Sequence, residues 1–173
     1  MRRDTIGREP PSGGHDDSVI VGDLLDGEDW KPLPLGQQGH PNYKWFDGTL
    51  LADAPIDFAA TFDGGMWVTR KPIDVNGFNR NPLRVRPNFV VPRHHHNFDE
   101  MIFVLQGEYS IDHGEGPERA VTLVKAGECF MSEAGTPYTM TAGPEGVTYI
   151  ETWPDHVIRL ETYWYRQGWV GRS

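Results

Sequence analysis

The sequence predicts an all-β fold, because strand-like runs recur along the chain with turn residues between them. Among its 173 residues are 20 glycines and 14 prolines, which favour short elements joined by turns over long helices. From residue 56 onward, about eight short runs alternate or are continuously apolar, and Gly, Pro, Asp or Asn stands at the joints. Short strands at this spacing are typical of a β-sandwich or a β-barrel.

The expected elements follow in chain order. Residues 31–48 combine prolines, glycines and an aromatic cluster, so we expect an irregular covering segment with one or two short strands. The runs 56–62 and 65–73 alternate roughly as strands do, and the two glycines between them predict a turn. Residues 154–169 fit either a helical face or a strand. The other strands are expected within 83–92, 101–111, 120–132, 136–142 and 147–153.

The length and the composition indicate one domain preceded by an arm. Residues 1–18 are polar and rich in Gly, Pro and Asp, so we expect a flexible, irregular N-terminal arm. A chain of this length has the usual size of one domain and is long enough to bury a substantial core. Because no internal repeat or second unit is visible, residues 19–173 are expected to form a single β-barrel domain.

The charge balance limits the partners of the protein. Acidic residues outnumber Lys and Arg by 25 to 16, which gives a formal net charge of −9. Nucleic acids and acidic membrane surfaces are bound through Lys and Arg, so neither partner is expected. No apolar stretch is long enough to span a membrane, and none follows the N-terminal arginines as in a secretory signal. The single cysteine, Cys129, excludes an internal disulfide, and we expect a cytoplasmic protein.

Aromatic residues gather near the end of the chain. The segment 163–169, YWYRQGW, has four aromatic residues among its seven. A dense aromatic surface suits a subunit interface, as does the N-terminal arm, so we expect a homodimer or a higher homo-oligomer. The alternative is that these aromatic side chains pack beneath the barrel of their own chain.

The stretch PRHHHNFDEMIFVLQG at 92–107 carries the strongest chemical signal. On a strand, residues two apart face the same side, so His94 and His96 face one way and His95 the other. Their Cα atoms would lie roughly 6–7 Å apart, and imidazoles can reach from there to one ion at about 2.1 Å. The spacer NFD can turn and bring Glu100 over the histidines. Two imidazoles and one carboxylate form the ligand set that ferrous iron uses in oxygen-activating enzymes.

The same stretch can also be interpreted as a solvated loop, with Asp99 and Glu100 as ordinary surface charges. The apolar run that begins at Met101, however, predicts a buried strand. Ionisable groups that lead directly into a buried strand need a partner, because burying them alone is costly. A metal ion would be such a partner, and we therefore prefer the metal site.

These residues resemble the first motif of the cupin family. His94-x-His96, three residues, Glu100, six residues and Gly107 match that motif without a gap. The resemblance covers about residues 56–153 and implies an antiparallel jelly-roll β-barrel with a metal ion inside the barrel mouth. It implies His94, His96 and Glu100 as the ligands of that ion.

The second motif of the family is only partly present. Gly127 and Gly135 match it, whereas Glu133 stands where a Pro is usual and Tyr138 stands where the fourth ligand, a His, is usual. Tyr138 could bind the ion as a phenolate, donate a hydrogen bond to substrate as the catalytic residue, or form part of the cavity wall. We prefer the last two roles, because ligands other than His, Cys, Asp and Glu are uncommon.

The residues and the resemblance together predict a metal-dependent enzyme that acts on a small organic molecule. Fe(II) is favoured as the ion, and Zn, Mn or Ni would also suit these ligands. With Fe(II), we expect a dioxygenase-like oxidoreductase acting on an aromatic, enol or diketone-like substrate. The alternatives are a non-redox isomerase, cyclase or lyase, in which Tyr138 donates a proton, and a non-catalytic ligand-binding cupin.

Overall fold

The fold is seen in a computed structural model of the chain. The predicted arm, residues 1–18, lies outside the residues that this structure describes, and the assignment of residues 19–173 to a single domain stays a prediction. The described residues are 23–25, 29–33, 40–51, 54–69, 79–157 and 159–171.

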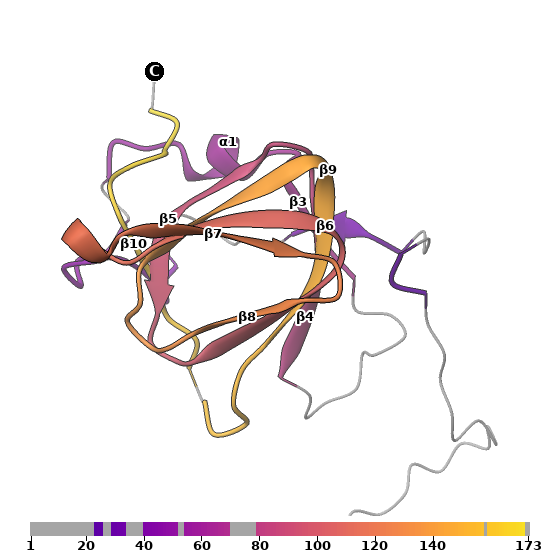
Figure 1. The fold of residues 1–173 in the computed structure, drawn as a ribbon. Helices are drawn as coiled ribbons and strands as arrows, with labels where there is room; N and C mark the ends of the chain where they lie inside the picture. Colours follow the sequence, from indigo (N-terminus) through magenta and orange to yellow (C-terminus); the bar gives the residue numbers. More distant parts are fainter. Residues whose placement is uncertain are drawn as a thin grey trace, which may run out of the picture.

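The prediction of an all-β, jelly-roll fold is confirmed. The described residues form a sheet of ten strands that curls around a common interior (Figure 1). Along the main path the strands lie in the order β1-β3-β4-β9-β5-β10-β2, and β6 pairs with β7, β8 and β9. The pairings are antiparallel except between β10 and β2. The strands are β1 (Lys31–Pro32), β2 (Tyr43–Trp45), β3 (Met66–Val68), β4 (Arg80–Val85), β5 (Val90–His96), β6 (Glu100–His113), β7 (Ala120–Lys125), β8 (Cys129–Ser132), β9 (Tyr138–Thr152) and β10 (Thr162–Trp164).

Two long strands organise the sheet. β6 has 14 residues and β9 has 15, and β9 pairs with β4, β5 and β6. The sequence predicted two strands, 136–142 and 147–153, where β9 is one continuous strand, so this part of the prediction is wrong. The two glycines and the proline within 143–146 favour a turn, but the strand continues through them with Gly146 at a positive φ of 80°.

The predicted strand at 56–62 is also wrong, because most of it forms the short helix α1 (Phe58–Phe62). Asp57 caps the helix by accepting a hydrogen bond from the backbone N–H of Ala60, at 2.9 Å. The buried residues Phe58, Thr61 and Phe62 follow the i, i+3, i+4 spacing of a helical face. Asp57, directly before the apolar residues, is the sequence signal for the start of a helix. The rough alternation of 56–62 favoured a strand instead. One further short helix, the 3₁₀ turn η1, spans Gly116–Glu118.

The C-terminal aromatic segment joins the core of its own chain. β10 resolves the ambiguity at 154–169, since the last regular element there is a strand. Trp164 is buried and meets Trp169 edge to face, with ring centroids 5.2 Å apart. It also contacts Phe58 and Phe62 of α1 in edge-to-face geometry. These contacts use part of the aromatic cluster inside the chain, and the predicted homo-oligomer stays a prediction.

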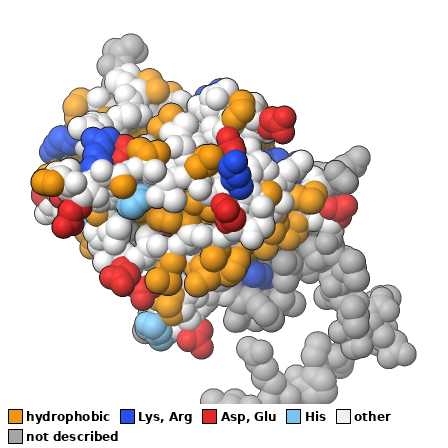
Figure 2. Space-filling model, in the orientation of Figure 1, with side chains coloured by type: hydrophobic (Ala, Val, Ile, Leu, Met, Phe, Trp, Pro, Cys, Tyr) orange, Lys and Arg blue, Asp and Glu red, His pale blue; other side chains and the backbone are white. Residues whose placement is uncertain are grey.

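The outer face of β6, β7 and β8 exposes apolar side chains. Figure 2 shows hydrophobic side chains gathered across the face that these strands present. Val121 is 67% exposed and Met131 is 58% exposed, and Phe103 and Leu123 lie on the same strands with more than a third of their surface exposed. Within the described part of the chain, no helix is long and apolar enough to cross a membrane.

A glycine on β6 allows β6 and β9 to approach closely. Gly107 has a φ of +75°, and a Cβ atom built on it would stand 2.1 Å from the carbonyl oxygen of Gly146. Gly127 has a φ of +88°, but a Cβ atom there would meet nothing within 4 Å. A side chain at either position would strain the backbone, but only at Gly107 would it also overlap with a neighbouring strand.

We expect Gly107→Ala to lower the free energy of unfolding by about 3 kcal/mol, because it adds strain and forces β6 and β9 apart. Gly127→Ala, the matched control, should cost only about 1 kcal/mol from its left-handed backbone. Urea denaturation of both variants measures the difference. Equal losses would contradict the close approach of the two strands.

Candidate functional site

The curled sheet encloses a cavity of about 310 Å³. Aromatic and aliphatic side chains form most of its wall, including Tyr43, Phe62, Phe98, Ile102, Met140, Tyr149, Trp153 and Trp164. Its polar lining consists of His40, Asn42, Asn81, His94, His96, Glu100, Tyr138, Glu151 and Thr162. All four predicted site residues, His94, His96, Glu100 and Tyr138, therefore lie in one cavity.

The alternation of β5 explains how the histidines are directed. His94 and His96 pair with Trp164 and Thr162 of β10, and both line the cavity, with ring centroids 5.1 Å apart. His95 does not line the cavity and stacks on Tyr163, with centroids 4.9 Å apart and planes within 7°. The period of two along a strand therefore separates the two predicted ligands from the histidine between them.

Both cavity imidazoles are held in the neutral form. Burial, and then the neighbouring His96, lower the pKa of His94 to about 3, and burial lowers the pKa of His96 to about 4. His94 Nδ1 lies 2.7 Å from the carbonyl oxygen of Pro92, which can only accept a hydrogen bond, so Nδ1 carries the proton and Nε2 keeps its lone pair. This is the arrangement in which a histidine binds a metal through Nε2.

Glu100 is buried at the start of β6, where the turn 97–99 brings it beside the histidines. Its Oε1 lies 3.7 Å from His96 Nε2, and its Oε2 accepts a hydrogen bond of 2.5 Å from the hydroxyl of Tyr138. Because His96 is neutral, the contact with Glu100 is polar rather than an ion pair. Burial raises the pKa of the Glu100 carboxyl above its ordinary value.

Tyr138 is buried, and its hydroxyl is engaged with Glu100. Burial, and then the adjacent Glu100 carboxyl, raise the pKa of Tyr138 well above the ordinary value. The hydroxyl therefore keeps its proton at neutral pH in this arrangement and acts as a hydrogen-bond donor. The phenolate role considered from the sequence would require a metal to remove that proton.

A second carboxyl group, Glu151 of β9, was not identified from the sequence. It lines the same cavity as Glu100, and Asn81 Nδ2 donates a hydrogen bond to its Oε1 at 2.6 Å. Burial, and then the nearby Glu100 carboxyl, raise the pKa of Glu151. Alternation along β9 places Val147, Tyr149 and Glu151 on one face, and this was the signal that could have identified the residue.

The side chains are not arranged as a closed metal site. Within the described ranges, no group of three or more His, Cys, Asp or Glu side chains is placed so that it could hold a metal ion. The types of donor nevertheless suit a cation, because two neutral imidazoles line the same cavity as the buried carboxyl of Glu100. The residues thus fit a metal ion chemically, and loading would have to draw the side chains together.

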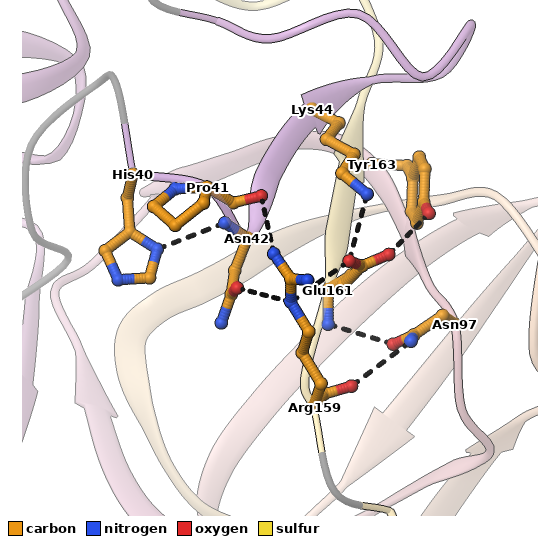
Figure 3. Close-up of polar contacts among 8 residues, drawn as sticks. All are labelled: His40, Pro41, Asn42, Lys44, Asn97, Arg159, Glu161 and Tyr163. Atoms are coloured by element: carbon orange, nitrogen blue, oxygen red, sulfur yellow. Dashed lines mark hydrogen bonds and ion pairs between the residues drawn. The ribbon is translucent and has the colours of Figure 1, made fainter.

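A polar network fixes the segments beside the cavity mouth (Figure 3). Glu161, just before β10, accepts from Lys44 Nζ at 2.9 Å and from the Tyr163 hydroxyl at 2.7 Å. Asn97 accepts from the Glu161 backbone N–H at 2.9 Å and donates to the carbonyl of Arg159 at 3.2 Å. His96 Nδ1 lies 3.3 Å from the hydroxyl of Thr162, the residue after Glu161, so this segment also helps to determine where the imidazole lies.

The family comparison agrees with this geometry. Residues 83–153 match the family model of the cupin domain, and this range runs from the second half of β4 to the end of β9 and includes every predicted site residue. Residues 83–153 are therefore similar to a cupin domain, and the resemblance inferred from the motif is confirmed. No curated protein matches the chain significantly in sequence.

Several solved structures match part of this chain. Vicilin from hazelnut, Corylus avellana, is 18% identical over 57% of this chain, with a TM-score of 0.46. Oxalate decarboxylase from Bacillus subtilis, solved at pH 4.6, is 17% identical over 58% of this chain, with a TM-score of 0.48. The match covers 31% of the vicilin chain and 28% of the decarboxylase chain. At these values the two structures give no guide to the activity of this chain.

The network around Glu161 gives a prediction about order at the cavity mouth. Asn97→Ala removes two hydrogen bonds to the segment 159–161, and we expect it to lower the free energy of unfolding by about 1 kcal/mol. Hydrogen exchange at the Glu161 amide, which Asn97 protects, should become faster, whereas the exposed control Gln106→Ala should leave it unchanged. Wild-type exchange in Asn97→Ala would show that the network does not hold this segment.

Proposed function

We propose that this protein is a metal-dependent cupin enzyme in which His94, His96 and Glu100 hold one divalent ion. The observation that supports the proposal most strongly is that two neutral imidazoles and a buried carboxyl share one apolar cavity. In the described lining of that cavity there is no Lys or Arg to balance a carboxylate. A bound cation would remove the cost of burying this group without a partner.

The ligand set is compatible with Fe(II), Zn, Mn or Ni, and we favour Fe(II). Two imidazoles and a carboxylate leave open positions on the ion, and this set is typical of ferrous oxygenases. When bound, the ion would supply Lewis-acid activation of a substrate oxygen and, as Fe(II), a site for reaction with dioxygen. The reaction proposed is a dioxygenase-like oxidation in which dioxygen is the oxidant and both of its atoms enter the substrate.

The cavity wall indicates the class of substrate. A volume of about 310 Å³ accommodates a small ring system, and the wall is largely aromatic and aliphatic. Without a basic side chain in the described lining, a substrate carboxylate would find no ion-pair partner from the protein. We therefore propose an uncharged aromatic, enol or diketone-like substrate that offers one or two oxygens.

The remaining polar residues have distinct roles in this proposal. Tyr138 orients Glu100 through its hydrogen bond and keeps a proton on its hydroxyl oxygen, close to where substrate would bind. The Pro92 carbonyl and the Thr162 hydroxyl orient the two imidazoles. Trp164 packs against the His94 ring, with centroids 4.8 Å apart, and helps to keep water away from it.

Two alternatives each have one observation in their favour. The protonated Tyr138 hydroxyl suits a non-redox isomerase, cyclase or lyase, in which it would supply a proton to the substrate. The lack of a closed three-residue metal group in the described part of the chain suits a ligand-binding cupin that needs no metal. The two experiments below distinguish these alternatives from the dioxygenase.

The first experiment measures metal content. We expect His94→Ala, His96→Ala and Glu100→Ala to lose the ion, because each removes one of three donors. His95→Ala is the matched control and should keep the ion, since that ring lies against Tyr163 outside the cavity. Tyr138→Phe should also keep the ion and change turnover. Elemental analysis of anaerobically purified, folded variants measures this, and unchanged metal content in all three alanine variants would favour the metal-free binding module.

The second experiment measures oxygen consumption. A panel of phenols, enols and β-diketones should contain a substrate whose turnover consumes dioxygen in a one-to-one ratio. A carboxylate-bearing analogue of the same size should be turned over at least about tenfold more slowly, because the cavity offers it no cationic side chain. Full turnover under strict anaerobiosis would exclude the dioxygenase and support the non-redox alternative.

A further inference from the structure

Glu151 and Glu100 line the same cavity and come from the neighbouring strands β9 and β6. We propose that Glu151 is a fourth donor to the metal ion and takes the place of the histidine that the second cupin motif lacks in this chain. This inference rests on the proposed metal centre and adds a residue to it. The ligand set would then be two imidazoles and two carboxylates.

The sheet register places Glu151 where a donor is needed. Glu151 of β9 is paired with Asn81 on β4 and with Ile102 on β6. Glu100 is two residues before Ile102 on β6, so the two glutamates rise from the same face of neighbouring strands. The donation from Asn81 Nδ2 fixes one oxygen of Glu151, as an outer hydrogen bond fixes a ligating carboxylate in many metal sites.

The position of the missing histidine cannot provide this donor as it stands. Tyr138 occupies that position, and its hydroxyl is used in a hydrogen bond to Glu100. Tyr138, in the second motif, therefore positions Glu100, a proposed ligand from the first motif. Glu151, 13 positions further along the same strand, supplies an oxygen donor at the cavity wall instead.

The chemistry of the cavity also favours a cation between these groups. Two adjacent carboxyl groups repel each other once ionised, and no Lys or Arg in the described lining separates them. A divalent ion with two carboxylates and two imidazoles forms a centre of zero formal charge, which is the least costly to bury in an apolar cavity.

This assignment has a consequence for the choice of ion. Carboxylate oxygens favour harder cations such as Mn²⁺, whereas imidazoles alone favour Zn²⁺ and Cu²⁺. The second carboxylate therefore shifts the preference of the site toward Fe²⁺ and Mn²⁺. It also leaves the bound ion without excess positive charge, which agrees with an uncharged substrate.

The test is a calorimetric titration of the full-length, metal-free protein with Mn²⁺. Glu151→Gln has the same shape and should weaken binding by about tenfold or more, because an amide oxygen is a weaker donor than a carboxylate. Glu151→Asp, which keeps the charge, should restore part of the affinity. Glu145→Gln, on an exposed part of the same strand, is the matched control and should bind as the wild type does. The visible spectrum of the Co²⁺-loaded protein should change in Glu151→Gln and not in Glu145→Gln.

The outcomes separate this inference from the proposed function. If Glu151→Gln keeps wild-type affinity and the wild-type Co²⁺ spectrum while Glu100→Gln loses the ion, Glu151 is not a ligand and the three-residue centre stands. If the wild-type protein binds neither Mn²⁺ nor Co²⁺, both proposals fail. Circular dichroism of each variant confirms that lost affinity does not come from unfolding.

Discussion

Two imidazoles and two carboxyl groups share a cavity with aromatic walls, and their shared desolvation is the constraint on which the rest of the site depends. Burial makes the charged form of each group costly, so the histidines stay neutral and the pKa values of the carboxyls rise. Hydrogen bonds from Tyr138 to Glu100 and from Asn81 to Glu151 offset part of the cost of burying the two carboxyl groups. A nearby positive charge would offset the rest of that cost, and this is the physical basis for proposing a bound cation.

The fold produces this concentration of polar groups through its strand register. β5, β6 and β9 are neighbours in the curled sheet, and each contributes polar side chains to the cavity from its inward face. β10 pairs with the edge of β5 that β9 does not occupy, and this pairing brings Trp164 against His94. The network around Glu161 then ties β2 and β10 to the turn that precedes Glu100. Strand pairing therefore fixes the walls of the cavity, and the polar network around Glu161 fixes the segments at its mouth.

Much of this arrangement could be predicted from the sequence, and the exceptions have physical reasons. The placement of His94 and His96 on one face followed from the period of a strand, which holds because β5 is extended there. Glu151 has no local motif, and its role appears only when register brings β9 beside β6. The helix α1 was missed because five residues are too few for a helical period to be distinguished from strand alternation. β9 was divided in two because its glycines suggested a turn, whereas here Gly146 allows a close approach of strands.

The central claim is that His94, His96 and Glu100 bind one divalent ion in the cavity. Crystals grown with Mn²⁺ and measured on both sides of the manganese absorption edge test it most directly. The account predicts one strong anomalous peak inside the cavity, at about 2.0–2.3 Å from the two imidazole nitrogens and the Glu100 carboxylate. A map of the same crystals with no peak in the cavity, while His94 stays on the Pro92 carbonyl and His96 on the Thr162 hydroxyl, would contradict it.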